Sequence, residues 1–597
     1  MVSEVDVAEL VSCPHGERCS GCPLLALKYS AQLERKTARV LEALARHRSL
    51  ASVTVAPAQG ADRRVEYRSR AKLVVGPGAS LGLYRAGSHE VEDIPDCRVL
   101  SPALRRVASL LRRELRALPA GVVHAVDLRE ARRGERAEVL LTLVAEPEQK
   151  AVNFAGLARA WMRAEPTLAG VSLATRRSRT VLGAEPRPLA GASAAWDTIG
   201  GVLHLAVPGA FTQAHREQAA WLHARLVAWL TAQLGSLRGA RILDVYGGSG
   251  AIGLALAKAG AQVTLFESFA PSAKAAAVAA KEQHLELDVR VGDATELLAR
   301  WDAAPPSAVV VNPPRKGLAP PLRLALGALR PRALAYVSCE PATLGRDLSH
   351  LADLGLRAAT LEPLDMIPLS ESVETFAGLL PAELAPLEVL HEDDDLLVVS
   401  KPPHATLTPT RGREPCWLWL VRERAGWKDA VAIAPGDAEA SGVACFAARP
   451  DGALRARQRV GAITYLALAK GITSKKGVIN RPVTHRGRSK PARTRYRRLE
   501  VRAGHSVLEV VVEAEQRQQV RRHLAAIGHP IVGDPHPDED ATRRHFWERH
   551  GLDRAFLHVR DVRLRQPDSQ LGCPLPGDLE SVLASLLGKS EFSPDLG

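Results

Sequence analysis

Two short apolar runs, each ending in a turn-prone motif, constrain the fold of this 597-residue chain most strongly. The first is VVV at 309–311, followed by NPPRKG, and the second is AYV at 335–337, followed by SCEPATLGRDL. Buried strands of a parallel sheet have this form, and they deliver their loops to one common edge. The pattern predicts an α/β fold with functional residues on these loops.

Cys339 lies in the second loop, between Ser338 and Glu340, with Pro341 next. A thiol between a strand end and a helix start is a candidate nucleophile, because a helix N-terminus favours the thiolate. A buried structural cysteine is the alternative that this motif alone leaves open.

An earlier predicted strand, RILDVY, runs into a glycine turn and a helix. Glycines at 247, 248 and 250 permit close approach of a ligand to the backbone, and Glu267, which ends the next strand, can bind ribose hydroxyls. Asp293 follows a third strand. The turn lacks the GxGxxG spacing of dinucleotide sites, so the pattern favours S-adenosylmethionine, which has no pyrophosphate.

Three cysteines near the N-terminus, Cys13, Cys19 and Cys22, form a C-x5-C-x2-C array. Three thiolates this close can bind one metal centre, and Cys97 is the best candidate for the fourth ligand that zinc or a cubane cluster needs. Residue chemistry leaves zinc and iron–sulfur both open. The 8 cysteines are not spaced as a disulfide framework, which predicts a reducing, cytoplasmic setting.

The charge balance favours a polyanionic partner. Lys and Arg number 79 against 66 Asp and Glu, a net charge of +13, and the simplest such partner is nucleic acid, although a GC-rich genome can also raise the arginine content. No apolar run is long enough for a membrane span and no secretion signal is evident, so we expect no membrane association. No protein partner is predicted.

Residues 10 to 380 resemble the RNA uracil-5-methyltransferase family, in particular its iron–sulfur branch that modifies 23S ribosomal RNA. The resemblance is carried by the four-cysteine head, YRSRAKL, FTQ, LDVYGGSG, NPPRKG, SCEPATLGRDL and DMIPLSESVE. It implies an RNA substrate, ribosomal rather than transfer RNA, and a [4Fe–4S] cluster on the four cysteines, with zinc as the alternative. It also implies an S-adenosylmethionine site lined by Gln213, Tyr246, Gly248, Gly250, Glu267, Asp293 and Asn312.

The chemistry of this family explains why a cysteine is needed. Carbon 5 of uracil is too poor a nucleophile to attack a methyl sulfonium, but a thiolate that adds at carbon 6 turns the ring into a reactive enolate. Carbon 5 must afterwards lose its proton to a general base. We predict Cys339 as the nucleophile and Glu374, in SVETF, as the base.

Two departures from the family matter. The family usually has Asp where this chain has Asn312, and an amide can pair with a uracil edge but cannot act as a carboxylate. Only twelve residues precede Cys13, which leaves no room for the RNA-binding β-barrel that often comes before the cysteine head. An amino-group methyltransferase is the second enzyme reading of NPP, but there an aromatic residue usually follows the prolines, whereas this chain has Arg315.

Residues 387 to 568 resemble the RluA-type pseudouridine synthases through EDDDLLVVSKPP, TYLALAKG and VRRHLAAIGHPIVGD. The catalytic aspartate of that family corresponds to Asp437, in APGDAEASG, which lacks the usual His-Arg pair before the aspartate. Tyr465 matches the tyrosine placed against the base, and Arg521 the arginine that pairs with the aspartate. The missing arginine normally helps to hold a flipped base. An active second site and an inactive RNA-binding module both stay open, with activity slightly favoured.

A basic stretch from Arg481 to Arg498 contains no acidic residue, which favours RNA contact. The expected fold class is α/β: a Rossmann-like methyltransferase domain with an α+β central domain, plus a C-terminal α+β pseudouridine-synthase-like domain with a mixed sheet. The predicted segments are a cysteine head and helix at 1–48, a central RNA-binding domain containing Cys97 at 49–203, the methyltransferase domain at 204–380, the pseudouridine-synthase-like domain at 387–570 and a tail at 571–597.

Overall fold

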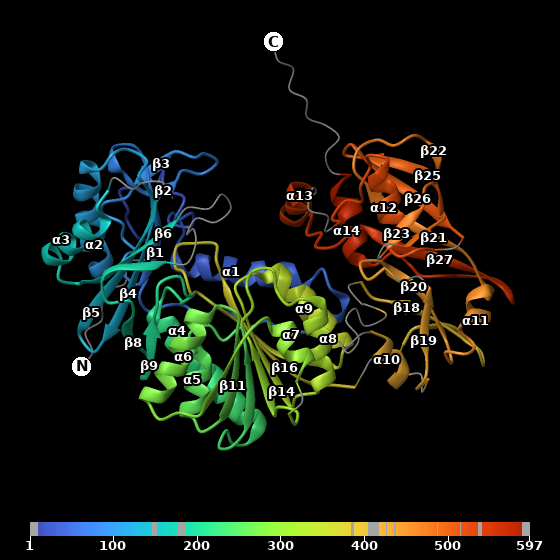
Figure 1. Ribbon diagram of the computed structural model, residues 1–597, viewed down its shortest axis with the longest axis horizontal. Coiled ribbons are helices and arrows are strands. Elements are labelled where there is room, and N and C mark those ends of the chain that lie inside the picture. Colours follow the sequence, from blue (N-terminus) through green and yellow to red (C-terminus); the bar gives the residue numbers. More distant parts are fainter. Residues whose placement is uncertain are drawn as a thin grey trace, which may run out of the picture.

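The structure is a computed structural model that describes residues 10–145, 152–175, 186–301, 303–383, 387–403, 407, 417–424, 427–434, 437–485, 488–513, 515–534 and 540–587. Three units, each built on its own large sheet, follow one another along the chain (Figure 1). We call them the N-terminal unit (the β1–β7 sheet), the middle unit (the β10–β16 sheet) and the C-terminal unit (the β17–β28 sheet). In Figure 1 they lie at the left, centre and right.

The N-terminal unit packs helices α2 and α3 on a sheet of strand order β3-β2-β1-β4-β5-β6-β7. Ser101 caps α2 by accepting a hydrogen bond from the Leu104 N–H, with Pro102 in the first turn, which is a favourable helix start. The elements are β1 (Arg70–Val75), β2 (Leu81–Tyr84), β3 (Val91–Asp93), α2 (Pro102–Glu114), β4 (Val123–Arg133), β5 (Arg136–Ala145), α3 (Phe154–Ala164), β6 (Leu168–Thr175) and β7 (Arg187–Gly191).

A hairpin, β8 (Ala195–Ile199) and β9 (Val202–Ala206), and the long helix α4 (Arg216–Leu234) lead into the middle unit. Its sheet has the order β12-β11-β10-β13-β14-β16-β15, in which β10 to β14 are parallel and β16 is antiparallel to both neighbours. The strands are β10 (Arg241–Val245), β11 (Gln262–Glu267), β12 (Leu287–Val291), β13 (Ala308–Val311), β14 (Ala333–Ser338), β15 (Leu356–Leu364) and β16 (Glu374–Pro381).

The two apolar runs of the sequence are the central strands β13 and β14, whose residues are almost completely buried. Strand order reverses between β10 and β13, and ligands bind beside the carboxyl ends of strands at such a point. The helices are α5 (Ala251–Lys258), α6 (Ala270–Glu282), α7 (Ala294–Ala299), α8 (Pro320–Leu329) and α9 (Pro341–Asp353), and the earlier α1 (Tyr29–Leu44) packs on α9.

The C-terminal unit is a mixed sheet of order β17-β18-β20-β27-β21-β26-β25-β22, in which the β20–β27 pair is parallel. Its strands are β17 (Val389–Glu392), β18 (Leu396–Lys401), β19 (Val431–Ala434), β20 (Ser441–Ala447), β21 (Val460–Ala469), β22 (Lys476–Asn480), β25 (Arg493–Arg502), β26 (His505–Val512), β27 (Leu557–Arg565) and β28 (Asp568–Gly572). A separate two-stranded sheet consists of β23 (Val483–His485) and β24 (Arg488–Lys490). Its helices are α10 (Trp417–Arg424), α11 (Ala453–Arg459), α12 (Gln519–Ala526), α13 (Asp540–His550) and α14 (Gly577–Ser585).

One hydrophobic core runs from the middle unit into the C-terminal unit. Leu324 and Leu326 of α8 belong to the same cluster of buried side chains as Trp417 and Val421 of α10. At the edge of this contact, the Arg330 guanidinium lies 5.9 Å from the centre of the Trp419 ring. Burial of this apolar surface favours a fixed arrangement of the two units.

The predicted fold class is confirmed: a Rossmann-like sheet is flanked by an α+β unit and by a mixed-sheet unit. The segment boundaries stay predictions. Within the described ranges, no helix combines the length and the apolar character that crossing a membrane requires.

Candidate active site

Cys339 and Glu374 lie at the ends of two neighbouring strands. Cys339 directly follows β14, and α9 begins at Pro341, as the sequence predicts. Strand β16 runs antiparallel to β14 with Ser338 opposite Thr375, so the next position along this register pairs Cys339 with Glu374. Two predicted catalytic residues from distant parts of the chain therefore meet at one sheet edge.

The thiol of Cys339 is half-buried and protonated at neutral pH. Burial, followed by the charge of the Glu374 carboxylate, raises its pKa to about 11, and the Arg315 guanidinium acts in the opposite direction. Desolvation therefore acts against the thiolate that a helix N-terminus favours. Formation of the thiolate needs additional positive charge or a proton acceptor.

Glu374 is only 5% exposed. Burial raises its pKa to about 7, while a hydrogen bond from the Gln213 side chain and the Arg315 cation act in the opposite direction. A carboxyl group with a pKa near 7 exchanges protons at neutral pH, which suits a general base. Gln213, predicted to contact a cofactor, thus also orients the predicted base.

Arg315 is the cation that the sequence interpretation missed. Its guanidinium acts on both Cys339 and Glu374, although Arg315 is itself exposed. The sequence contained the signal, because Arg315 lies in a loop after a buried strand. Loops at the carboxyl ends of such strands also carry the other site residues.

A cavity opens beside the carboxyl ends of β10 and β13. Gln213, Tyr246, Gly248 and Asn312, four of the predicted cofactor residues, line it together. Several other polar atoms on its wall are buried and have no hydrogen-bond partner among the described residues; these are both Asp244 carboxylate oxygens, both His204 ring nitrogens, His223 Nδ1 and Ser249 Oγ. Buried polar groups are normally paired, so this wall has the chemistry to receive a polar ligand.

The glycine turn after β10 is shaped for close approach. Tyr246 and Gly250 have positive φ angles of 63° and 84°, and a side chain at Gly247 would meet Leu265 and Asp244 within 3 Å. Glu267 accepts a hydrogen bond from the Gly248 N–H at 3.0 Å. The predicted ribose-binding carboxylate therefore lies directly against the turn.

Asp293 is exposed and follows β12, at the same carboxyl end of the parallel sheet. Its carboxylate caps α7 by accepting from the N–H groups of Thr295 and Glu296, at 2.9 and 3.2 Å. Burial, followed by the charges of Asp293 and Asp347, raises the pKa of Tyr246 to about 12. Asp293 is thus within electrostatic reach of the cavity, although it does not line it.

Two further wall residues were not singled out from the sequence. Asp244, inside β10, is completely buried, and burial raises its pKa to about 7. Phe211, in the FTQ motif, is 62% exposed at the cavity and offers an aromatic face. A carboxylate inside an otherwise apolar strand was the available signal for Asp244.

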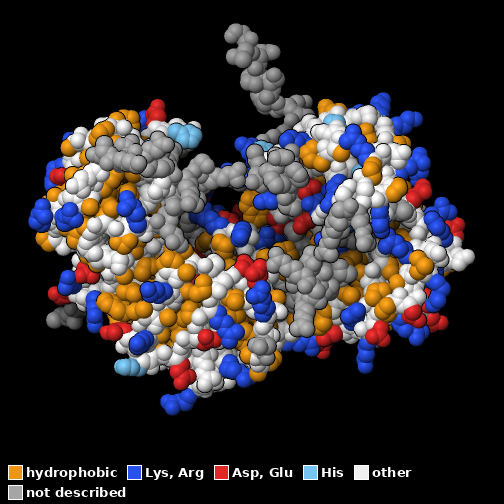
Figure 2. All heavy atoms as spheres, in the orientation of Figure 1, with side chains coloured by type: hydrophobic (Ala, Val, Ile, Leu, Met, Phe, Trp, Pro, Cys, Tyr) orange, Lys and Arg blue, Asp and Glu red, His pale blue; other side chains and the backbone are white. Residues whose placement is uncertain are grey.

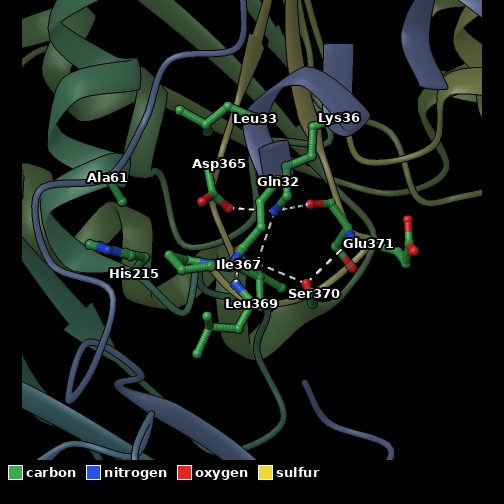
Figure 3. A network of polar contacts seen from close by, with 12 residues as sticks. Gln32, Leu33, Lys36, Ala61, His215, Asp365, Ile367, Leu369, Ser370 and Glu371 are labelled. Atoms are coloured by element: carbon green, nitrogen blue, oxygen red, sulfur yellow. Dashed lines mark hydrogen bonds and ion pairs between the residues drawn. The ribbon is translucent and has the colours of Figure 1, made fainter. Parts of the chain in front are cut away.

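A buried network supports the segment that leads to Glu374 (Figure 3). Lys36 of α1 is fully buried, pairs with Asp365 and donates to the carbonyls of Ile367 and Ser372 at 3.0 and 2.8 Å. Gln32, one helical turn earlier, accepts from the Leu369 N–H at 3.2 Å. Helix α1 therefore holds the backbone of residues 365–373 just before β16 begins.

The cysteine head lies next to that segment. The Leu24 N–H donates to the Leu369 carbonyl at 3.1 Å. Burial, followed by the charges of Cys97, Cys19 and Cys13, raises the pKa of Cys22 to about 12, so the other three thiols are within electrostatic reach of Cys22. In the described part of the chain, no three His, Cys, Asp or Glu side chains form a ready metal site. The metal centre stays a prediction.

In the C-terminal unit, Asp437, Tyr465 and Arg521 also come together. Arg521 Nη1 lies 3.4 Å from Asp437, but the guanidinium makes its shorter bonds, 2.9 and 2.6 Å, to Asp534. The Tyr465 hydroxyl donates to Glu515. Lys401, which the sequence interpretation missed, is buried near Asp437, and burial lowers its pKa to about 7.

In the folded structure, acidic side chains from other segments partly balance the charge of the basic stretch from Arg481 to Arg498. Arg497 lies opposite Glu509 across the β25–β26 pair and bonds it at 3.0 Å, and Arg495 pairs with Glu513 at 2.7 Å. Lys and Arg side chains still edge much of the C-terminal unit in Figure 2. The surface favours polyanions, but by a smaller margin than the sequence indicates.

Known proteins resemble the chain in sequence and in fold. No family model matches it. An uncharacterized RNA methyltransferase of Thermosynechococcus vestitus is 32% identical over 380 residues, which span 62% of this chain and 83% of that protein. Another, from Gloeobacter violaceus, is 32% identical over 387 residues, spanning 62% and 82%.

Among solved structures, the tRNA (uracil-54, C5)-methyltransferase of Pyrococcus abyssi in complex with S-adenosyl-L-homocysteine superposes with a TM-score of 0.50. The sequences are 24% identical, and the match covers 61% of this chain and 86% of that one. This likeness shows a shared fold.

Proposed function

The chain belongs to the RNA methyltransferase family, and we propose that it transfers the methyl group of S-adenosylmethionine to carbon 5 of a uridine in RNA. The observation that carries the proposal is the meeting of Cys339 with the buried Glu374 across the β14–β16 register. Methylation at an exocyclic nitrogen requires neither a thiol nor a base at that point.

In the proposed reaction, the Cys339 thiol loses its proton to solvent, Arg315 stabilises the thiolate, and the sulfur adds to carbon 6 of the uracil. The resulting enolate attacks the methyl group through carbon 5, and S-adenosylhomocysteine leaves. Glu374 then removes the carbon 5 proton, and the electron pair of that C–H bond re-forms the ring double bond and expels the Cys339 thiolate. Glu374 must therefore be ionised, which its pKa of about 7 permits at neutral pH.

The residues around the cavity are proposed to bind the methyl donor. Glu267 suits the ribose hydroxyls, and the unpaired Asp244 carboxylate suits the donor's ammonium group. Gln213, Tyr246, Gly248 and Asn312 line the same space, with Gly250 and Asp293 beside it. Phe211 offers a stacking face for an unstacked base.

The four cysteines are proposed to bind a [4Fe–4S] cluster, and the substrate is proposed to be ribosomal RNA. The mutual influence of the thiols supports the first proposal, because neighbouring thiolates that repel one another are stabilised when they share a metal centre. Iron, sulfide and zinc analysis of anaerobically purified protein distinguishes a cluster from zinc.

A second candidate function, pseudouridine formation, is favoured by the convergence of Asp437, Tyr465 and Arg521 in the C-terminal unit. The alternative is an RNA-binding module without catalysis. Pseudouridine in RNA treated with the wild type, and its loss in Asp437→Ala, would support catalysis.

The central experiment incubates anaerobically purified protein with methyl-labelled S-adenosylmethionine and either ribosomal or transfer RNA, followed by nucleoside mass spectrometry. We expect 5-methyluridine, predominantly in ribosomal RNA, and none with Cys339→Ala. A methylated adenine or guanine would contradict the proposal and revive the amino-group alternative. No transfer from the intact protein to either RNA would also contradict it.

A further inference from the structure

Three side chains on one face of α9 hydrogen-bond to the backbone of the loop after β13, residues 312–318, and we call this set of contacts the grip. Thr343 Oγ1 donates to the Arg315 carbonyl at 3.0 Å, and Arg346 Nη2 donates to the Lys316 carbonyl at 2.8 Å. Asp347 accepts from the Leu318 N–H at 2.7 Å. These three gripping side chains are spaced i, i+3 and i+4 and so project from the same side of the helix. The grip holds Arg315 near Cys339 and Glu374.

The grip contains more positive than negative charge. Asp347, fully buried, pairs with both Arg323 at 2.6 Å and Arg346 at 2.8 Å. One carboxylate therefore faces two guanidinium groups, and a buried charge without a counter-charge is costly. The middle unit alone leaves this cluster incompletely balanced.

The missing counter-charge comes from the C-terminal unit. Arg346 Nη1 lies 3.2 Å from an Asp553 carboxylate oxygen, and the two side chains are each only 14% exposed. The same guanidinium thus contacts the Lys316 carbonyl, Asp347 and Asp553. The hydrophobic core shared by α8 and α10 helps to keep the two units, and hence this contact, in place.

We propose that the C-terminal unit is a working part of the methyltransferase site, and that Asp553 is a positioning residue that acts through Arg346 on the loop carrying Arg315. The proposal rests on the proposed methyl transfer at Cys339. It gives the C-terminal unit a role in methylation that depends neither on pseudouridine formation nor on RNA binding.

A matched control is present in the same interface. Arg330 pairs with Glu423 between the same two units, but these side chains are 60% and 40% exposed, and among the described residues no hydrogen bond links them to the loop. Asp553→Asn and Glu423→Gln each remove one inter-unit ion pair at almost constant volume. Asp553 also lines a cavity of about 580 Å³ between the units, so its substitution requires no repacking of a core.

Two measurements on the full-length variants test the proposal. For Asp553→Asn we expect kcat for methyl transfer to fall roughly 5- to 20-fold, because small displacements of a catalytic group are costly, while KM for S-adenosylmethionine is unchanged. The Leu318 amide, whose hydrogen bond depends on the grip, should exchange with deuterium faster. Asp553→Glu should restore much of both, and Glu423→Gln should match the wild type in both.

A wild-type methyl-transfer rate and wild-type amide exchange in both Asp553→Asn and Glu423→Gln would overturn the proposal. An equal loss in both variants would also overturn it, since it would indicate a general loosening of the interface. If the wild type transfers no methyl group, the proposed function fails, and the exchange comparison alone decides whether Asp553 positions the loop.

Discussion

Cys339 and Glu374 lie one position beyond the last β14–β16 pair, Ser338 with Thr375, and the Glu374 carboxylate raises the pKa of the Cys339 thiol. The carboxylate therefore favours the neutral thiol before a substrate binds. A neutral thiol is protected from wasteful reaction, and a carboxylate with a pKa near 7 is available once the ring has been methylated.

Replacing the base should separate the two halves of the reaction. In Glu374→Gln, addition of Cys339 to the ring and methylation can proceed, but the carbon 5 proton is not removed. We expect a covalent protein–RNA adduct that survives denaturing electrophoresis and carries the transferred methyl label. The double variant Cys339→Ala/Glu374→Gln is the control, and an adduct in that protein would place the bond elsewhere.

The same substitution should make the thiol more acidic, because it removes a negative charge that raises the pKa of Cys339. Alkylation of Cys339 by iodoacetamide at pH 8.5, followed by peptide mass spectrometry, should be several-fold faster in Glu374→Gln than in the wild type. Arg315→Gln should slow it, since the cation stabilises the thiolate. Unchanged rates in both variants would contradict the electrostatic coupling.

Methyl transfer should rise with pH through the titration of Glu374. Its pKa is raised to about 7, so the carboxylate that acts as a base is absent below that value and forms above it. The Cys339 thiolate also becomes more abundant as pH rises, so both groups give the same sign. Single-turnover rates between pH 5.5 and 9 provide the measurement, and a rate that falls over this range would contradict the assignment.

The titration of Asp244 should affect stability with the opposite sign: a higher pH should speed methyl transfer but destabilise the fold. Burial raises its pKa to about 7, so folding favours the protonated form, and this contribution to stability is lost as pH rises through that value. At pH 8, Asp244→Asn should therefore raise the melting temperature, and the free energy of unfolding should increase by up to about 4 kcal/mol. At pH 3 the substitution should raise neither. It should also weaken S-adenosylmethionine binding by calorimetry, and unaltered binding would remove Asp244 from the site.

The sequence predicted the local parts of the site well. Val309 to Val311 form a continuous apolar run, and such a run has few alternatives to a buried strand, so the loop that contains Asn312 could be located. The pairing of Cys339 with Glu374 required the antiparallel insertion of β16 between β14 and β15, which is a non-local choice that no local pattern encodes.

Contacts between other segments that are distant in the sequence could not be predicted from local patterns either. The stretch from Arg481 to Arg498 contains no acidic residue, yet the β25–β26 register places Glu509 opposite Arg497. The sequence predicts a boundary before residue 387, but no local pattern indicates that buried side chains of α8 and α10 form one core. Deletion of residues 387–597 would therefore expose apolar surface, and point variants test the C-terminal unit more cleanly.

The final prediction concerns Asn312, the position at which this chain departs from the family it resembles. Asn312 lines the same cavity as Asp244, so Asn312→Asp would add a carboxylate next to a buried acid whose pKa is already raised. Gln213, on the same wall, hydrogen-bonds Glu374, so the added negative charge should also disfavour ionisation of Glu374 and move the rising limb of the pH–rate profile to higher pH. Asn312→Ser removes the amide without adding charge, and it should lower the rate without moving the profile. If Asn312→Asp also leaves the limb in place, the side chain acts through hydrogen bonds to the target base alone, and its charge does not reach Glu374.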